Sequence, residues 1–181
     1  QEYANSVESG FDLVNVDCST IRDRDNLIKL KKAYDKYKKS ISILVNEVCR
    51  GKCPIKDEHY ALNCSLESKE VYFNQKISEV SCKRWRREIP HYHLMISNMP
   101  IYRKDFEEIL EYVQVLKLHG RRTNEPFYDS MKIVQRYADE KEEVIFESKK
   151  EKFDMHLYDK KILEKWNEYT KNCKFQCWEC T

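Results

Sequence analysis

The sequence predicts an all-α fold, a compact bundle of five to six helices stapled by about four disulfides, and three observations support this prediction. Apolar side chains recur at steps of three and four residues over long stretches, which is the period of a helix packed along one face. The chain of 181 residues has only three glycines and four prolines, too few turn residues for a sandwich or a barrel. Its eight cysteines are an even number, which favours four disulfides and an oxidising compartment.

The stretch 19–53 predicts the longest helix. Ser19 or Thr20 is the expected N-cap, Gly51 the expected stop, and lysines hold the outer face in water. A helix of about 29 residues would be roughly 43 Å long, so the other helices should lie along it. The apolar positions on its inner face are Leu27, Leu30, Tyr34, Tyr37, Ile41, Leu44 and Val48.

The remaining elements follow from the same periodicity within a single domain, 1–181. Residues 1–18 are expected to be an extended N-terminal segment, loose at first, in which Phe11 to Val16 is a strand or simply extended chain. Residues 173–181 form an expected cysteine-rich C-terminal staple. Further helices are expected from Asp57 to Cys64, from Ser65 or Ser68 to before Pro90, from Asn98 to Gly120, after Asn124, and from Phe153 to Asn172.

The cysteines are interpreted as disulfide partners, although eight cysteines allow 105 pairings. Zinc bound by Cys49/Cys53 and Cys177/Cys180 is the weaker alternative, because these spacings match no standard finger and leave four cysteines unexplained. A redox role for Cys177 and Cys180 is also the weaker interpretation, since no βαβ pattern surrounds them. The expected disulfide residues are Cys18, Cys49, Cys53, Cys64, Cys82, Cys173, Cys177 and Cys180.

Catalytic and cofactor motifs are not found in the sequence. It has no glycine-rich phosphate loop, nucleophile elbow or His-Glu-x-x-His motif, and His91 and His93 lack a recognisable set of further metal ligands nearby. The prediction is a protein that is not an enzyme, with no cofactor and no metal.

One basic cluster is the candidate interaction patch, formed by Lys83, Arg84, Trp85, Arg86 and Arg87. Four cations in five residues can bind a sulfated polysaccharide, phospholipid head groups or an acidic receptor face. The alternative is that Trp85 belongs to the core and the cations flank it in water. The net charge of +2 is far from that of a dedicated nucleic-acid binder, so no nucleic-acid partner is expected.

Secretion is the expected localisation. The chain starts at Gln1 without Met, which is typical of a mature protein whose signal peptide has been removed, and no membrane-spanning run is found. The protein is expected to be a monomer. Its 12 Tyr, 7 Phe and 3 Trp either fill the core or line a ligand pocket between helices.

Cys18, followed by Cys49-x3-Cys53 at the end of a predicted helix, is similar to the opening of the insect odorant-binding proteins and their salivary relatives. The similarity covers the first third of the chain, and the later Cys-x8-Cys spacing of that family is absent. It implies a scavenger of small host mediators, such as biogenic amines or lipids, in an aromatic-lined pocket.

Over most of its length the chain resembles the small helical salivary proteins of blood-feeding mosquitoes. The resemblance rests on the Gln1 start, the eight cysteines, the helices rich in Lys, Glu and Tyr, and the Cys177-Trp178-Glu179-Cys180 tail. It implies a secreted, non-enzymatic effector that modulates host inflammation by stimulating neutrophils. The implied partner is a component of the host immune-cell surface. Sulfated polysaccharide is the candidate for that component.

Overall fold

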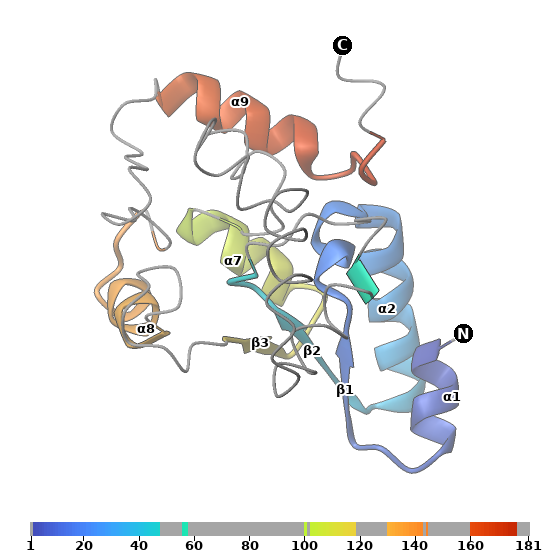
Figure 1. Ribbon diagram of the computed structural model, residues 1–181. Helices are drawn as coiled ribbons and strands as arrows, with labels where there is room; N and C mark the ends of the chain where they lie inside the picture. Colours follow the sequence, from blue (N-terminus) through green and yellow to red (C-terminus); the bar gives the residue numbers. More distant parts are fainter. Residues whose placement is uncertain are drawn as a thin grey trace, which may run out of the picture.

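The computed structural model describes residues 2–47, 56–57, 100, 102–118, 130–142, 144 and 160–176. Their architecture is a three-stranded parallel sheet with helices packed against it (Figure 1), so the prediction of an all-α bundle is wrong. The elements in chain order are α1 (Glu2–Glu8), β1 (Leu13–Val16), the 3-10 helix η1 (Cys18–Arg22), α2 (Arg24–Tyr37), β2 (Ser40–Leu44), α7 (Arg103–Leu110), β3 (Val115–Lys117), α8 (Ser130–Ala138) and α9 (Lys160–Thr170).

The sheet has the order β1-β2-β3, with β2 in the centre. Leu13 is opposite Ser40 at one end of the first pair, and Ser42 is opposite Val115 in the second. Parallel neighbours require a crossover between strands, and α2 supplies the crossover from β1 to β2. Since α7 leads directly into β3, the strands and helices alternate as in two successive β-α-β units.

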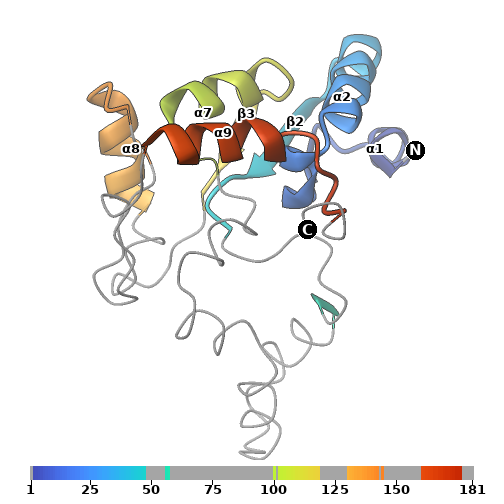
Figure 2. The same cartoon turned by 90° about the horizontal axis from the view of Figure 1, so that it is seen from above.

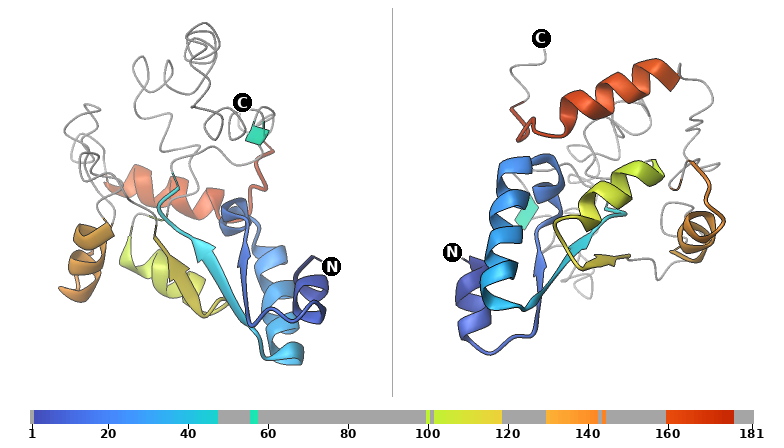
Figure 3. Two further views of the ribbon diagram at one scale, coloured as in Figure 1. Left: turned by 60° about the horizontal axis from the view of Figure 1, so that its bottom comes forward. Right: turned by 180° about the vertical axis from the view of Figure 1, so that it is seen from behind.

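The core lies on one face of the sheet. Ile41, Ile43 and Val45 alternate along and just beyond β2 and are fully buried, together with Leu30 of α2 and Phe106 of α7. The two crossover helices therefore cover the same face, as strands laid down in one direction require. Figure 3 shows these helices together behind the sheet in its left view. Also in this core are Tyr3, Ile109, Val113, Ile133 and Val144.

The long helix expected over 19–53 is divided into η1, α2 and β2. Lys38 takes the left-handed conformation with φ 57° and donates its N–H to the Tyr34 carbonyl at 2.7 Å, which ends α2. Beyond it, Ser40 to Ile43 alternates hydroxyl and branched apolar side chains, the two-residue period of a strand. Ile41 fits both the helical period and the two-residue period of a strand. The β-branched side chains of Ile41 and Ile43 favour the strand.

The N-terminal segment is partly helical rather than extended. In α1 the Tyr3 ring is only 5% exposed, packs edge-on against Tyr37 with centroids 6.2 Å apart, and its hydroxyl donates to the Lys39 carbonyl. The expectation of a strand within 11–16 is confirmed by β1.

The helix expected over 98–120 ends earlier than the sequence predicts. It is only α7, because Val113 packs in the turn after it and Leu116 belongs to β3. In α8 the buried residue is Ile133, whereas Met131 and Val134 are 75% and 50% exposed.

The prediction of a disulfide staple is also wrong for the cysteines that are described. Within the described residues no two sulfur atoms lie at bonding distance, and Cys173 forms no disulfide. Its sulfur instead accepts the Phe175 N–H at 3.4 Å. Cys49, Cys53, Cys64, Cys82, Cys177 and Cys180 lie outside the described residues.

Polar contacts hold the residues after α9 against the start of α2. Asn172 Oδ1 accepts the Arg24 N–H at 3.0 Å, and Lys174 donates its N–H to the Arg22 carbonyl at 3.0 Å. The Arg22 guanidinium lies 5.2 Å from the centroid of the Phe175 ring, which is 7% exposed. The chain is therefore docked here by hydrogen bonds and a buried ring, where a cysteine staple was expected.

Candidate functional site

A pocket of about 50 Å³ lies where α2, α7 and α9 meet. Figure 2 shows α9 running beside α7, with the start of α2 close to the end of α9. The pocket is partly open to solvent, and its wall combines aliphatic and charged side chains. The lining residues are Ile21, Arg22, Arg24, Leu27, Pro100, Asp105, Glu108, Ile109, Tyr112, Asn167, Thr170 and Lys171.

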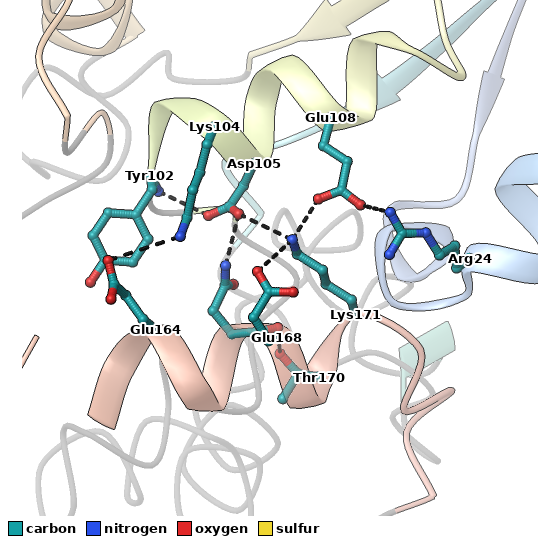
Figure 4. Close-up of polar contacts among 10 residues, drawn as sticks. Arg24, Tyr102, Lys104, Asp105, Glu108, Glu164, Glu168, Thr170 and Lys171 are labelled. Carbon is teal, nitrogen blue, oxygen red and sulfur yellow. Dashed lines mark hydrogen bonds and ion pairs between the residues drawn. The ribbon is translucent and has the colours of Figure 1, made fainter. Parts of the chain in front are cut away.

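Helical spacing places the polar groups of the pocket. Asp105 and Glu108 are three residues apart on α7, and Asn167 and Lys171 are four residues apart at the end of α9, so each pair shares one side of its helix. Ile109, the neighbour of Glu108, is 5% exposed in the core and orients α7. The two carboxylates of α7 thus face the ammonium of Lys171, just after α9 (Figure 4), and Asp105 also meets the amide of Asn167.

Asp105 joins the two helices by hydrogen bonds. Its Oδ2 accepts the Tyr102 N–H at 3.2 Å, and its Oδ1 accepts from Asn167 Nδ2 at 2.8 Å. The first contact satisfies a donor at the start of α7, and the second reaches across to α9.

Lys171 lies at the centre of the ion pairs. Its Nζ is 2.5 Å from Glu108 Oε2, 2.7 Å from Glu168 Oε1 and 3.9 Å from Asp105 Oδ1. The other Glu108 oxygen, Oε1, pairs with Arg24 of α2. Glu108 therefore connects all three helices of the pocket (Figure 4).

The charges at the pocket balance. Its lining carries three cations, Arg22, Arg24 and Lys171, and two carboxylates, Asp105 and Glu108. Glu168, which pairs with Lys171 at 2.7 Å, brings the count to three of each sign. The pair Lys104–Glu164, 3.9 Å apart, adds one of each.

Burial sets the protonation of this network. Burial raises the pKa of Asp105 above its ordinary value, and the hydrogen bonds from Asn167 and Tyr102 offset only part of that rise. Burial also opposes ionisation of Lys171, but hydrogen bonds to Glu108 and Glu168 outweigh it and raise the pKa of the lysine. Lys171 is therefore charged at neutral pH.

The pocket volume limits what can enter. A cavity of about 150 Å³ binds benzene, so a space of about 50 Å³ suits a few water molecules or one small charged group. A lipid chain does not fit inside it. Tyr112 is the one aromatic among the lining residues given above, so this pocket differs from the aromatic-lined pocket that the sequence suggested.

A second polar cluster follows the carboxyl end of β1. Asp17 Oδ1 accepts the Ser19 N–H at 2.8 Å and caps η1, while its other oxygen pairs with Lys56. Burial, with Asp17 and Glu47 nearby, raises the pKa of the Cys18 thiol to about 11. The protonated thiol is a poor nucleophile at neutral pH.

Most of the site residues that the sequence predicts lie outside the described residues. The patch Lys83 to Arg87 lies outside the described residues, as do His91 and His93. Conversely, Asp105, Glu108 and Lys171 were not among the site residues that the sequence predicted. The available signal was an acidic pair three residues apart on a helix whose neighbours are apolar, and such pairs are common on exposed helices.

Comparisons with protein-family models, with curated proteins and with solved structures found no match to the chain. Among the described helices, none is long and apolar enough to cross a membrane. The same part of the chain holds no group of three His, Cys, Asp or Glu side chains that could bind a metal ion.

Proposed function

We propose that the chain is a secreted, non-enzymatic protein that modulates host inflammation by holding a small host amine at the pocket between α2, α7 and α9. Secretion and the inflammatory role are supported by the salivary resemblance. The amine is supported by one observation: a partly open pocket at which carboxylates already hold an ammonium group, that of Lys171.

The position of Lys171 supports an ammonium as the bound group. The lysine ammonium lies within 2.7 Å of both Glu108 and Glu168. The carboxylates at this site are therefore already arranged to pair with an ammonium group. Carboxylates keep further lone pairs for a second donor, and the side chain of Asp105 lines the same pocket. The remainder of the amine would lie against Leu27 and Tyr112, which also line the pocket.

The side chains of the pocket and of the cluster around Asp17 favour a binding protein over an enzyme. The Cys18 thiol stays protonated at neutral pH, and both oxygens of Asp105 are engaged in hydrogen bonds. Of the two classes of mediator, amines are preferred because the pocket volume of about 50 Å³ is too small for a lipid chain.

The test is calorimetry of the full chain with a panel of biogenic amines, with lipid mediators run on the same preparation. We expect at least one amine to bind, and Glu108→Gln to weaken it at least about tenfold, because a charge-assisted contact is lost. Glu107→Gln is the matched control, since Glu107 is exposed on the same helix and pairs with Arg103 at 2.7 Å. A silent amine panel would sink the proposal.

The second candidate is direct stimulation of neutrophils through a surface patch. It is favoured by the cluster Lys83, Arg84, Trp85, Arg86 and Arg87, with four cations in five residues. Charge reversal of these four cations should abolish binding to leukocytes and their activation. Unchanged cell activation would remove this candidate and leave amine binding standing.

A further inference from the structure

The outer face of α2 carries a row of lysines that the pocket does not use. Lys29, Lys32 and Lys36 follow one another at steps of three and four residues, so they share one side of the helix over about 10 Å. All three are exposed, and Leu27 and Leu30 on the opposite side are buried. We call these three residues the lysine stripe.

The lysine stripe differs from several other cations near α2 because it forms no direct ion pair. Within the described part of the chain, no carboxylate contacts Lys29, Lys32 or Lys36, although Lys29 is near enough to Asp25 to help lower the pKa of that carboxyl. Three cations close by are paired: Lys38 with Asp35 at 3.7 Å, Lys174 with Asp25 at 2.5 Å, and Lys39 with Asp12. The stripe therefore projects a net positive field into solvent.

We propose that the lysine stripe is a binding surface for sulfated polysaccharide. Lysine ammonium groups on long flexible stems match sulfates distributed along a linear chain, whereas paired phosphate recognition favours the arginine fork. The contact rests on the proposed secretion, since it needs an extracellular partner.

Two other polyanions fit the surface less well. A nucleic acid would use aromatic rings for stacking, but Tyr34 and Tyr37 of α2 pack against the core instead. A membrane would need several exposed apolar side chains beside the lysines. Among the large apolar residues of α2, only Ile28 is exposed, at 40%, so a membrane fits this surface less well. These partners become outcomes of the test.

The experiment measures the dissociation constant of the full chain for immobilised heparin at several salt concentrations. The variant Lys29→Glu/Lys32→Glu/Lys36→Glu is compared with the control Lys117→Glu/Lys141→Glu/Lys165→Glu. Both sets are exposed lysines and change the net charge equally, but the control positions are dispersed: one is on β3, one follows α8 and one is on α9. We expect the stripe variant to bind at least about tenfold more weakly and the control to stay within about threefold of the wild type.

Equal weakening in both variants would mean that only overall charge matters and would overturn the proposal, as would no weakening in either. If the Glu variant fails to fold, Lys29→Gln/Lys32→Gln/Lys36→Gln must show a smaller loss in the same direction. Tighter binding to duplex DNA or to anionic vesicles than to heparin, or equal binding to desulfated heparin, would also overturn it. Amine calorimetry on the stripe variant separates the two proposals, because the pocket should bind unchanged.

Discussion

Asp105 is the buried residue on which the contact between α7 and α9 depends. It is 5% exposed, and its two oxygens accept hydrogen bonds from Asn167 and from the Tyr102 N–H. Asp105→Ala leaves both donors without an acceptor, so we expect the free energy of unfolding to fall by about 2 kcal/mol. Urea denaturation measures this loss. The control Glu107→Ala, on the exposed side of α7, should stay within about 0.5 kcal/mol, and equal losses would contradict the role of Asp105.

Asp17 makes stability depend on acid pH. Burial opposes its ionisation, but hydrogen bonds from Lys56 and Ser19 outweigh this and lower its pKa below the ordinary 3.8. A lowered folded-state pKa gives stability that is present above 3.8 and is lost as pH falls through the folded value.

The variant Asp17→Asn keeps an oxygen to cap η1 but removes the charge. Because Asp17 is half exposed, we expect the wild type to be more stable by only about 0.5 kcal/mol at pH 6. This difference should shrink as the pH falls below 3.8. Urea denaturation of both proteins between pH 2 and 6 measures it, and a gap that widens on acidification would reverse the assigned sign.

At the scale of elements, the sequence predicts the inner face of α2 but not where the helix ends. Leu27, Leu30, Tyr34 and Tyr37 keep the helical period, and all four pack in or against the core. Ile41 continues that period by coincidence, so periodicity alone extends the helix. The preference of β-branched residues for strands, read over 40–45, would have marked the boundary.

Lys38 ends α2 in a conformation that favours glycine. Its φ of 57° places it in the left-handed region, where a side chain costs energy. Lys38→Gly should therefore raise the free energy of unfolding by up to about 1 kcal/mol, measured by urea denaturation. The matched control Lys32→Gly, exposed within the same helix, should lower it by about 1 kcal/mol. Destabilisation by both substitutions would show that the Lys38 side chain outweighs its backbone strain.

The candidate site could not be predicted from any single element. Asp105, Glu108 and Lys171 lie on two helices more than fifty residues apart in the chain, and each helix by itself has an ordinary charged outer face. Their chemistry arises only when α7 is fixed by Phe106 and Ile109 in the core. The basic patch was easier to notice because its cations are adjacent in sequence.

At the scale of the whole molecule, pairings between distant segments decide the fold. Ser42 of β2 is opposite Val115 of β3, and the Arg24 N–H at the start of α2 donates to Asn172 near the end of the described chain. Composition favoured helices and an even cysteine count favoured disulfides, but neither contains information about such pairings. The short strands β1 and β3, of four and three residues, give little periodic signal of their own.

The pair Lys171–Glu108 ties the last described helix to the β-α-β part of the molecule. The two side chains are 20% and 23% exposed, so water screens the pair only partly. In a double-mutant cycle of Glu108→Gln and Lys171→Met, we expect a coupling energy of about 1 kcal/mol at pH 7 from urea denaturation. A cycle of Lys104 and Glu164, which are 3.9 Å apart and more exposed, is the control and should give about 0.3 kcal/mol.

The pH dependence of that coupling follows from the lysine. The pKa of Lys171 is raised above its ordinary 10.5, because hydrogen bonds to Glu108 and Glu168 outweigh the effect of burial. A raised folded-state pKa gives stability that is complete below 10.5 and is lost as pH rises through the folded value. The coupling energy should therefore be the same at pH 7 and pH 9 and should decrease as the pH rises above 10.5. A coupling that is near zero at pH 7, or that grows in alkali, would mean that α9 is held on α7 by Asp105 and Asn167 alone.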